Sequence, residues 1–228
     1  MTASLASGFL ICSFASILAY FVCIFCFNSF LGKEDRNHMR NSFPYQYYSS
    51  FPRFFRIFLY SFLGLAVLLG GLGVIFYFSF LGGSFALILG ISFALSFLCL
   101  GLSNIIPLSA YKPHIILAIS SFLLFSLSSI LYMFINHFPC PNYNPQLVNR
   151  VICIIIGIVG FITFFSTFNP KLFSWFKMEK AEENGKTIYV KPKINWLAMY
   201  EWIFLILMAV AVLLLFVNVI IGNFVTVN

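Results

Sequence analysis

Charged side chains of either sign are scarce in this sequence. Only 8% of its 228 residues are charged and only six are acidic, whereas 61% are hydrophobic. An ordinary soluble domain carries about 25% charged residues, so the composition excludes that class and leaves no room for a sizeable soluble domain. The scarcity of charge therefore indicates an integral membrane protein.

Catalytic and metal-binding motifs are missing as well. The sequence contains no G-x-S-x-G, no H-E-x-x-H, no phosphate-cradling glycine loop and no second cluster of acidic residues. Five of the six cysteines lie within apolar runs, where a free cysteine behaves as a small hydrophobic residue, and only Cys140 lies in a connection. The residues therefore support no catalytic group, metal site, disulfide framework or cofactor.

Long apolar runs are what the sequence has in abundance. An α-helix needs about 20 apolar residues to cross the hydrocarbon of a bilayer, and six runs reach that length. The first run lacks the basic start of a signal peptide and exceeds its usual apolar length, so we expect it to be retained. We predict an all-α, polytopic membrane protein, a single domain of residues 1–228 forming a bundle of six transmembrane helices. Their predicted spans are 5–31, 57–81, 85–108, 115–135, 148–168 and 197–221.

The connections between the runs differ in length and character. The second is a tight turn at Gly82-Gly83, which predicts a hairpin of the second and third spans. The long, polar fifth connection contains Asn184-Gly185 followed by the β-prone stretch Thr187–Val190, which predicts a small β-hairpin. Small residues recur at every fourth position of the third span and predict a face for close helix packing: Gly82, Ala86, Gly90 and Ala94.

The basic residues are distributed unequally between the two membrane faces. Connections one, three and five and their flanks hold twelve of the thirteen, and only Arg150 lies opposite. The positive-inside rule places that basic face in the cytosol and both termini outside or in the lumen. The basic residues are thinly spread beside apolar stretches, so their expected anionic neighbours are lipid headgroups and not nucleic acid.

The first connection combines basic and aromatic side chains. Arg40 and Tyr45 lie within it, and Arg53 and Arg56 follow at the start of the second span. Guanidinium groups bind phosphate bidentately, and aromatic rings settle at the level of the headgroups. Two interpretations of Arg53 and Arg56 remain open: they engage one phosphate from the first turn of a helix that Pro52 starts, or they are interfacial anchors that snorkel to the surface.

Two further ionisable residues lie near the same membrane face. His114 opens the fourth span, where a histidine can titrate near neutral pH, donate to a phosphate or be a solvated helix-start residue. Glu201 lies about one turn into the sixth span, next to Trp202. Either Glu201 reaches the headgroup layer as part of a polar rim, or it faces the bundle and pairs with Arg53, Arg56 or His114.

The order of these features resembles a six-span membrane family. This is the DRAM (damage-regulated autophagy modulator), Frag and Sfk family, which includes the GPI-anchor lipid-remodelling factor PGAP-two and the N-terminal domain of CWH-forty-three. The resemblance covers nearly the whole chain. It rests on Phe43-Pro44-Tyr45 in the first connection and on Pro52-Arg53-x-x-Arg56, His114, Arg150 and Glu201-Trp202 at the starts of spans two, four, five and six. The family is drawn with cytosolic termini, opposite to the threading that the basic residues indicate.

The resemblance implies a non-enzymatic factor that assists GPI-anchor lipid remodelling or membrane-lipid distribution. Its partners would be membrane lipids and GPI-anchored proteins. Its location would be the endoplasmic reticulum, the Golgi or the endolysosomal membrane, with the plasma membrane as an alternative. A DRAM-like modulator of autophagy is a second reading. A transporter, hinted at by Asn104 and Pro107 in the third span, and a scaffold subunit with a membrane-protein partner are two others.

Overall fold

The computed structural model confirms the predicted fold class. It describes residues 2–31, 42, 44, 51–106, 111–138, 140–142, 147–169, 179–183, 186–190 and 195–225. Six helices in this part of the chain are long and apolar enough to cross a membrane. They are α1 (Thr2–Phe30), α3 (Arg53–Leu81), α4 (Ser84–Ile105), α5 (Tyr111–Met133), α6 (Leu147–Thr167) and α7 (Trp196–Val225).

The helix ends depart from the ends of the apolar runs. Helix α3 begins at Arg53, four residues before the predicted span, directly after Pro52, whose φ of −52° suits a helix start. Helix α4 ends at Ile105, three residues before its predicted end. Ile106 is extended with ψ 121°, because the residue before a proline is disfavoured in helical conformation. Apolar runs therefore mark the hydrocarbon, whereas local backbone preferences set where the helices begin and end.

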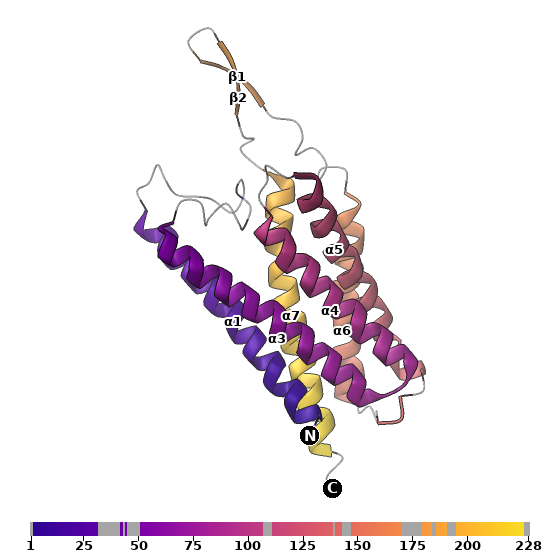
Figure 1. Ribbon diagram of the computed structural model, residues 1–228. Helices are drawn as coiled ribbons and strands as arrows, with labels where there is room; N and C mark the ends of the chain where they lie inside the picture. The colour runs from indigo at the N-terminus through magenta and orange to yellow at the C-terminus, as the bar shows by residue number, and fades with distance from the viewer. Residues whose placement is uncertain are drawn as a thin grey trace.

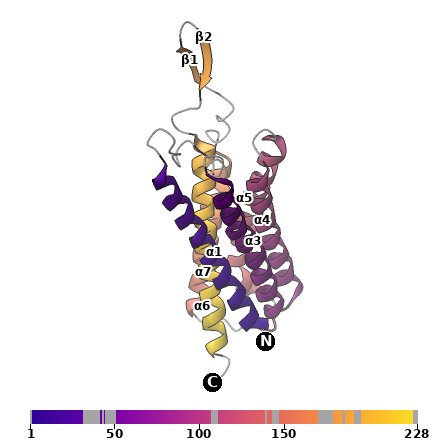
Figure 2. The ribbon, with the colours of Figure 1, turned by 60° about the vertical axis from the view of Figure 1, so that its left-hand side comes forward.

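The six helices form a closed ring in which neighbours in the chain are neighbours in space. Each helix packs against the next, and α7 closes the ring by packing against both α6 and α1. Figures 1 and 2 show that α3, α5 and α7 begin at one end of the bundle, while both termini lie at the other. We call these the basic end, after Arg53, Arg56 and Lys112, and the terminal end.

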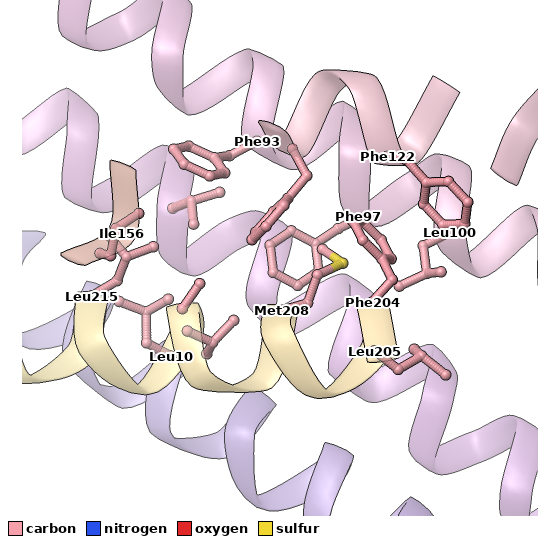
Figure 3. Packing of buried hydrophobic residues seen from close by; sticks show 14 of the residues in the cluster. Leu10, Phe93, Phe97, Leu100, Phe122, Ile156, Phe204, Leu205, Met208 and Leu215 are labelled. Carbon is pink, nitrogen blue, oxygen red and sulfur yellow. The ribbon is translucent and has the colours of Figure 1, made fainter. Parts of the chain in front are cut away.

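The interior of the ring is filled with aromatic and aliphatic side chains. Phe93 and Phe97 of α4, Phe122 of α5, and Phe204 and Met208 of α7 converge there (Figure 3). The rings of Phe122 and Phe204 lie 4.4 Å apart, centre to centre. Lipid tails are as apolar as these side chains, so close packing and dispersion, and not escape from water, hold membrane helices together.

The turn between α3 and α4 has the tight geometry that the sequence predicts. Gly82 and Gly83 adopt φ values of 75° and 86°, which only glycine adopts without strain. Gly82 therefore lies in the turn and not, as predicted, on one helical face with Ala86, Gly90 and Ala94. On that face, Ala86 is buried, a Cβ added to Gly90 would lie 2.9 Å from the Cβ of Phe78, and Ala94 lies next to Gly71 of α3.

Hydrogen bonds from serine side chains to the backbone of a neighbouring helix reinforce this packing. The hydroxyl groups of Ser96 in α4 and Ser121 in α5 donate to each other's backbone carbonyls, at 3.1 and 2.9 Å. Ser13 of α1 donates to the carbonyl of Ala66 in α3 at 2.7 Å. Small hydroxyl side chains allow helices to approach closely and satisfy polar groups that hydrocarbon cannot solvate.

The fifth connection contains the predicted β-hairpin. Strands β1 (Glu179–Glu183) and β2 (Lys186–Val190) pair antiparallel with Glu183 opposite Lys186. Two residues join them, which is the loop length that the Asn-Gly signal favours. These two residues, 184 and 185, lie outside the described part of the chain. Figure 1 shows the hairpin beyond the basic end of the bundle.

Candidate functional site

The most unusual feature of the bundle is a buried pair of ionisable side chains at the basic end. His114 lies in the first turn of α5, and Glu201 lies near the start of α7. Their side chains meet with His114 Nε2 3.3 Å from Glu201 Oε1. The residues are only 1% and 5% exposed, respectively. Of the two placements considered for Glu201, the structure shows the one that faces the bundle, and it selects His114 as the partner.

The local structure at both helix starts orients this pair. Asn195 precedes α7, and its side-chain Oδ1 accepts a hydrogen bond from the Ala198 backbone N–H at 3.1 Å, as an N-cap residue does. The other ring nitrogen of His114, Nδ1, lies 3.2 Å from the carbonyl oxygen of Ile106, just after α4. The histidine therefore joins the end of α4 to the starts of α5 and α7.

The hydrogen bonds constrain where the protons of the pair lie. A carbonyl oxygen only accepts, so His114 Nδ1 carries a proton that it donates to Ile106. One further proton between Nε2 and Oε1 completes the second hydrogen bond. It gives either a charged histidine beside a carboxylate or a neutral histidine beside a carboxylic acid. Both arrangements have no net charge, which is the condition for keeping two ionisable groups inside a membrane bundle.

Trp202, which follows the acid, fastens the first connection to α7. Its side chain is buried and its Nε1–H donates to the backbone carbonyl of Ser42 at 2.9 Å. The rings of Phe21 and Phe25 in α1 lie 6.0 and 6.5 Å from it, centre to centre. Trp202 thus packs inside the bundle, whereas Trp196 at the start of α7 is exposed.

The two arginines lie at the same end but apart from this pair. Arg53 and Arg56 occupy the first turn of α3, with Arg53 exposed and Arg56 half-buried. Within the described ranges, the ion pair of Glu201 is with His114 and with neither arginine. The Nε of Arg56 is shielded from solvent and has no hydrogen-bond partner among the residues that the structure describes. The predicted site residues Arg40 and Tyr45 lie outside those residues.

A second polar cluster, which the sequence analysis missed, lies at the terminal end. Asn218 of α7 donates through Nδ2 to the hydroxyl of Tyr132 and, at 3.2 Å, to that of Tyr77. The two hydroxyls are themselves hydrogen-bonded at 2.9 Å. Asn149 of α6 donates to the Asn218 side chain. All four residues are buried, so the cluster ties α3, α5, α6 and α7 together.

Replacing Asn218 by leucine should destabilise the bundle by about 1 to 2 kcal/mol. The substitution leaves the Asn149 amide and two tyrosine hydroxyls short of partners, and side-chain hydrogen bonds between membrane helices contribute about 0.6 kcal/mol on average and up to about 1.7. Thermal unfolding of the detergent-purified protein measures the loss. The exposed Val210 of the same helix supplies the control substitution, Val210→Leu, which should be neutral. Equal stability of the two variants would contradict the structural role of Asn218.

Together, the fold and these clusters define a polytopic α-helical integral membrane protein with one buried polar cluster near each end of its bundle. No protein-family model matches the chain, and neither a curated protein nor a solved structure matches it. Among the described residues, no three histidine, cysteine or acidic side chains lie together as metal ligands would.

Proposed function

We propose that this membrane protein binds phospholipid headgroups at its basic end and assists GPI-anchor lipid remodelling or the distribution of membrane lipids. The observation that carries the proposal is the placement of Arg53 and Arg56 on the first turn of α3. There the partial positive charge of a helix N-terminus adds to two guanidinium groups. The buried His114–Glu201 pair supports the site by fixing the starts of α5 and α7 at the same end.

The endomembrane system is the proposed location, in keeping with the resemblance to the DRAM, Frag and Sfk family. GPI-anchored proteins are the proposed cargo, because their anchors carry both phosphate and acyl chains. A scaffold subunit is the alternative class. Copurification from native membranes separates the two: bound phospholipid without a stoichiometric protein partner favours lipid handling, and a stoichiometric partner favours the scaffold.

Deleting the gene should change the lipid profile of the GPI-anchored fraction or of total membranes, as measured by lipidomics. Reintroducing the wild-type chain should restore the profile, whereas the double variant Arg53→Gln/Arg56→Gln should fail to restore it, because glutamine keeps a polar side chain but loses the charge that binds phosphate. Arg150→Gln is the matched control, since Arg150 is exposed at the start of α6, at the opposite end of the bundle.

Two results would count against the proposal in different ways. Unchanged profiles after deletion, in both the GPI-anchored and the total fractions, would remove the proposed function. A changed profile that the double arginine variant restores as fully as the wild type would keep the function but move the headgroup site elsewhere. Immunoblotting confirms that all variants reach equal levels in the membrane.

A further inference from the structure

A groove runs along the outer surface of the bundle between α3 and α4, at the basic end. Its volume is about 120 Å³, and its lining is almost entirely apolar. Tyr60, Leu98, Leu102 and Ile105 on its edges are exposed. The lining residues lie on facing stripes of the two helices: Tyr60, Leu63, Gly64 and Val67 on α3, and Leu98, Gly101, Leu102 and Ile105 on α4.

A glycine, Gly64, lies on the α3 wall of the groove. A Cβ placed on Gly64 would meet no atom within 4 Å, so the space beside this residue is open. On the opposite wall, a Cβ on Gly101 would lie 3.0 Å from Val67, so here the two helices approach closely. The open space beside Gly64 and the close helix contact at Gly101 together form a narrow groove, which suits a single extended hydrocarbon chain.

The groove leads toward the two arginines. Arg56 lies one helical turn before Tyr60 on the same face of α3, since residues four positions apart in a helix are stacked. Arg56 therefore lies about 6 Å closer to the membrane surface than Tyr60 along the helix axis. Arg53 lies three residues earlier and shares the face. A cationic, helix-N-terminal site thus stands directly above an apolar groove.

We infer that the α3–α4 groove and the arginine pair form one binding site for an anionic glycerophospholipid. The phosphate binds to Arg53 and Arg56 at the first turn of α3, and one acyl chain lies in the groove between Tyr60 and Val67. The Nε–H of Arg56, for which the described residues provide no acceptor, donates to an oxygen of this phosphate. This inference rests on the proposed function and deepens it by naming the lipid class and the path of its chain.

Charge complementarity decides between a lipid and the helix of a partner protein as the occupant. A partner helix would fill an apolar groove with small and aliphatic side chains, and it would gain from the two cations only by placing an acidic residue or its own C-terminus beside them. A phospholipid matches both parts of the site, because its phosphate and its chain are joined in the same order, from the membrane surface inward. Both walls belong to the membrane-spanning segments 53–81 and 84–105, so acyl chains are present at the required depth.

The experiment uses the full chain, purified in mild detergent, and a phosphatidylserine with a diazirine on one acyl chain. Titration with this probe and mass spectrometry of the crosslinked peptides should place the crosslinks on the groove residues, chiefly Leu98 and Leu102. Gly64→Leu, which fills the open space, should remove the crosslinks to these residues. Arg53→Gln/Arg56→Gln should weaken binding about tenfold or more, as expected for the loss of charge-assisted hydrogen bonds.

A control substitution on another helix distinguishes binding in the groove from nonspecific binding to the bundle surface. A Cβ on Gly8 of α1 also meets no atom within 4 Å, so Gly8→Leu adds the same bulk elsewhere and should leave crosslinking unchanged. Crosslinks spread evenly over all exposed helix faces, or unaffected by Gly64→Leu, would overturn the groove. A stoichiometric protein crosslinked there in native membranes would also overturn it. Binding in the groove together with an unchanged lipid profile after gene deletion would refute the proposed function alone.

Discussion

Replacing His114 by leucine is expected to lower the free energy of unfolding by about 3 kcal/mol, the largest effect of any single substitution considered for this protein. Removing one member of a buried ionisable pair leaves the other without compensation, which costs about 3 to 5 kcal/mol in proteins. Here Glu201 would keep a buried carboxyl group without its partner, and the carbonyl of Ile106 would lose a donor. Chemical or thermal unfolding in detergent micelles measures the change.

Two further variants separate the pair from general packing effects. Glu201→Gln should cost less than about 1 kcal/mol, because the glutamine amide can donate to Nε2 of a neutral His114 and keep the hydrogen bond. The double variant His114→Leu/Glu201→Leu should recover most of the loss, since replacing a whole buried pair by apolar residues is often neutral or stabilising. If the double variant is at least as unstable as His114→Leu alone, the side chains do not act as a pair.

Replacing Gly160 by alanine is expected to destabilise the bundle by about 2 kcal/mol. The added Cβ would lie 2.7 Å from the Cβ of Ser129 and 2.8 Å from the carbonyl oxygen of Ser126. Both atoms belong to or adjoin the α5 backbone and cannot rotate away, so α5 and α6 must separate, and overpacking of this kind costs about 1 to 3 kcal/mol. The same unfolding measurement applies.

Gly8→Ala is the control for this substitution. It places a methyl group in open space on α1, and alanine favours a helix over glycine by up to about 1 kcal/mol, so the variant should be as stable as the wild type or slightly more stable. An equal loss of stability in Gly8→Ala and Gly160→Ala would show that the α5–α6 contact does not explain the effect.

The sequence predicted the number of spans and their order because a membrane imposes a length on every crossing segment. The turn at Gly82-Gly83 and the hairpin around residues 184–185 were predictable for a similarly local reason, since few residue types fit those turns. The predicted helix ends were less accurate than the predicted number of spans. The end of α4 depends on the backbone restriction imposed by Pro107, which apolar content does not report.

The sequence placed His114 and Glu201 at the same end of the bundle, which narrowed the candidate partners of the acid to three. The choice among them depends on how α5 and α7 are rotated about their axes, and tertiary packing alone fixes that rotation. The cluster around Asn218 was harder to find. Asn149 and Asn218 are 69 positions apart, and the only signal in the sequence was an amide side chain within each of two apolar runs.

Helix α7 is fastened at two depths, which limits how the bundle can move. Glu201 and Asn218 are 17 residues apart in that helix, a distance of about 25 Å along its axis, which is most of the thickness of the hydrocarbon layer. An alternating-access carrier rocks one half of its helices against the other. Such rocking would break the contacts of Glu201 in one half-cycle and those of Asn218 in the next. The contacts of Glu201 and Asn218 therefore hold α7 against its neighbours near both ends of the bundle and oppose a rocking motion of this helix.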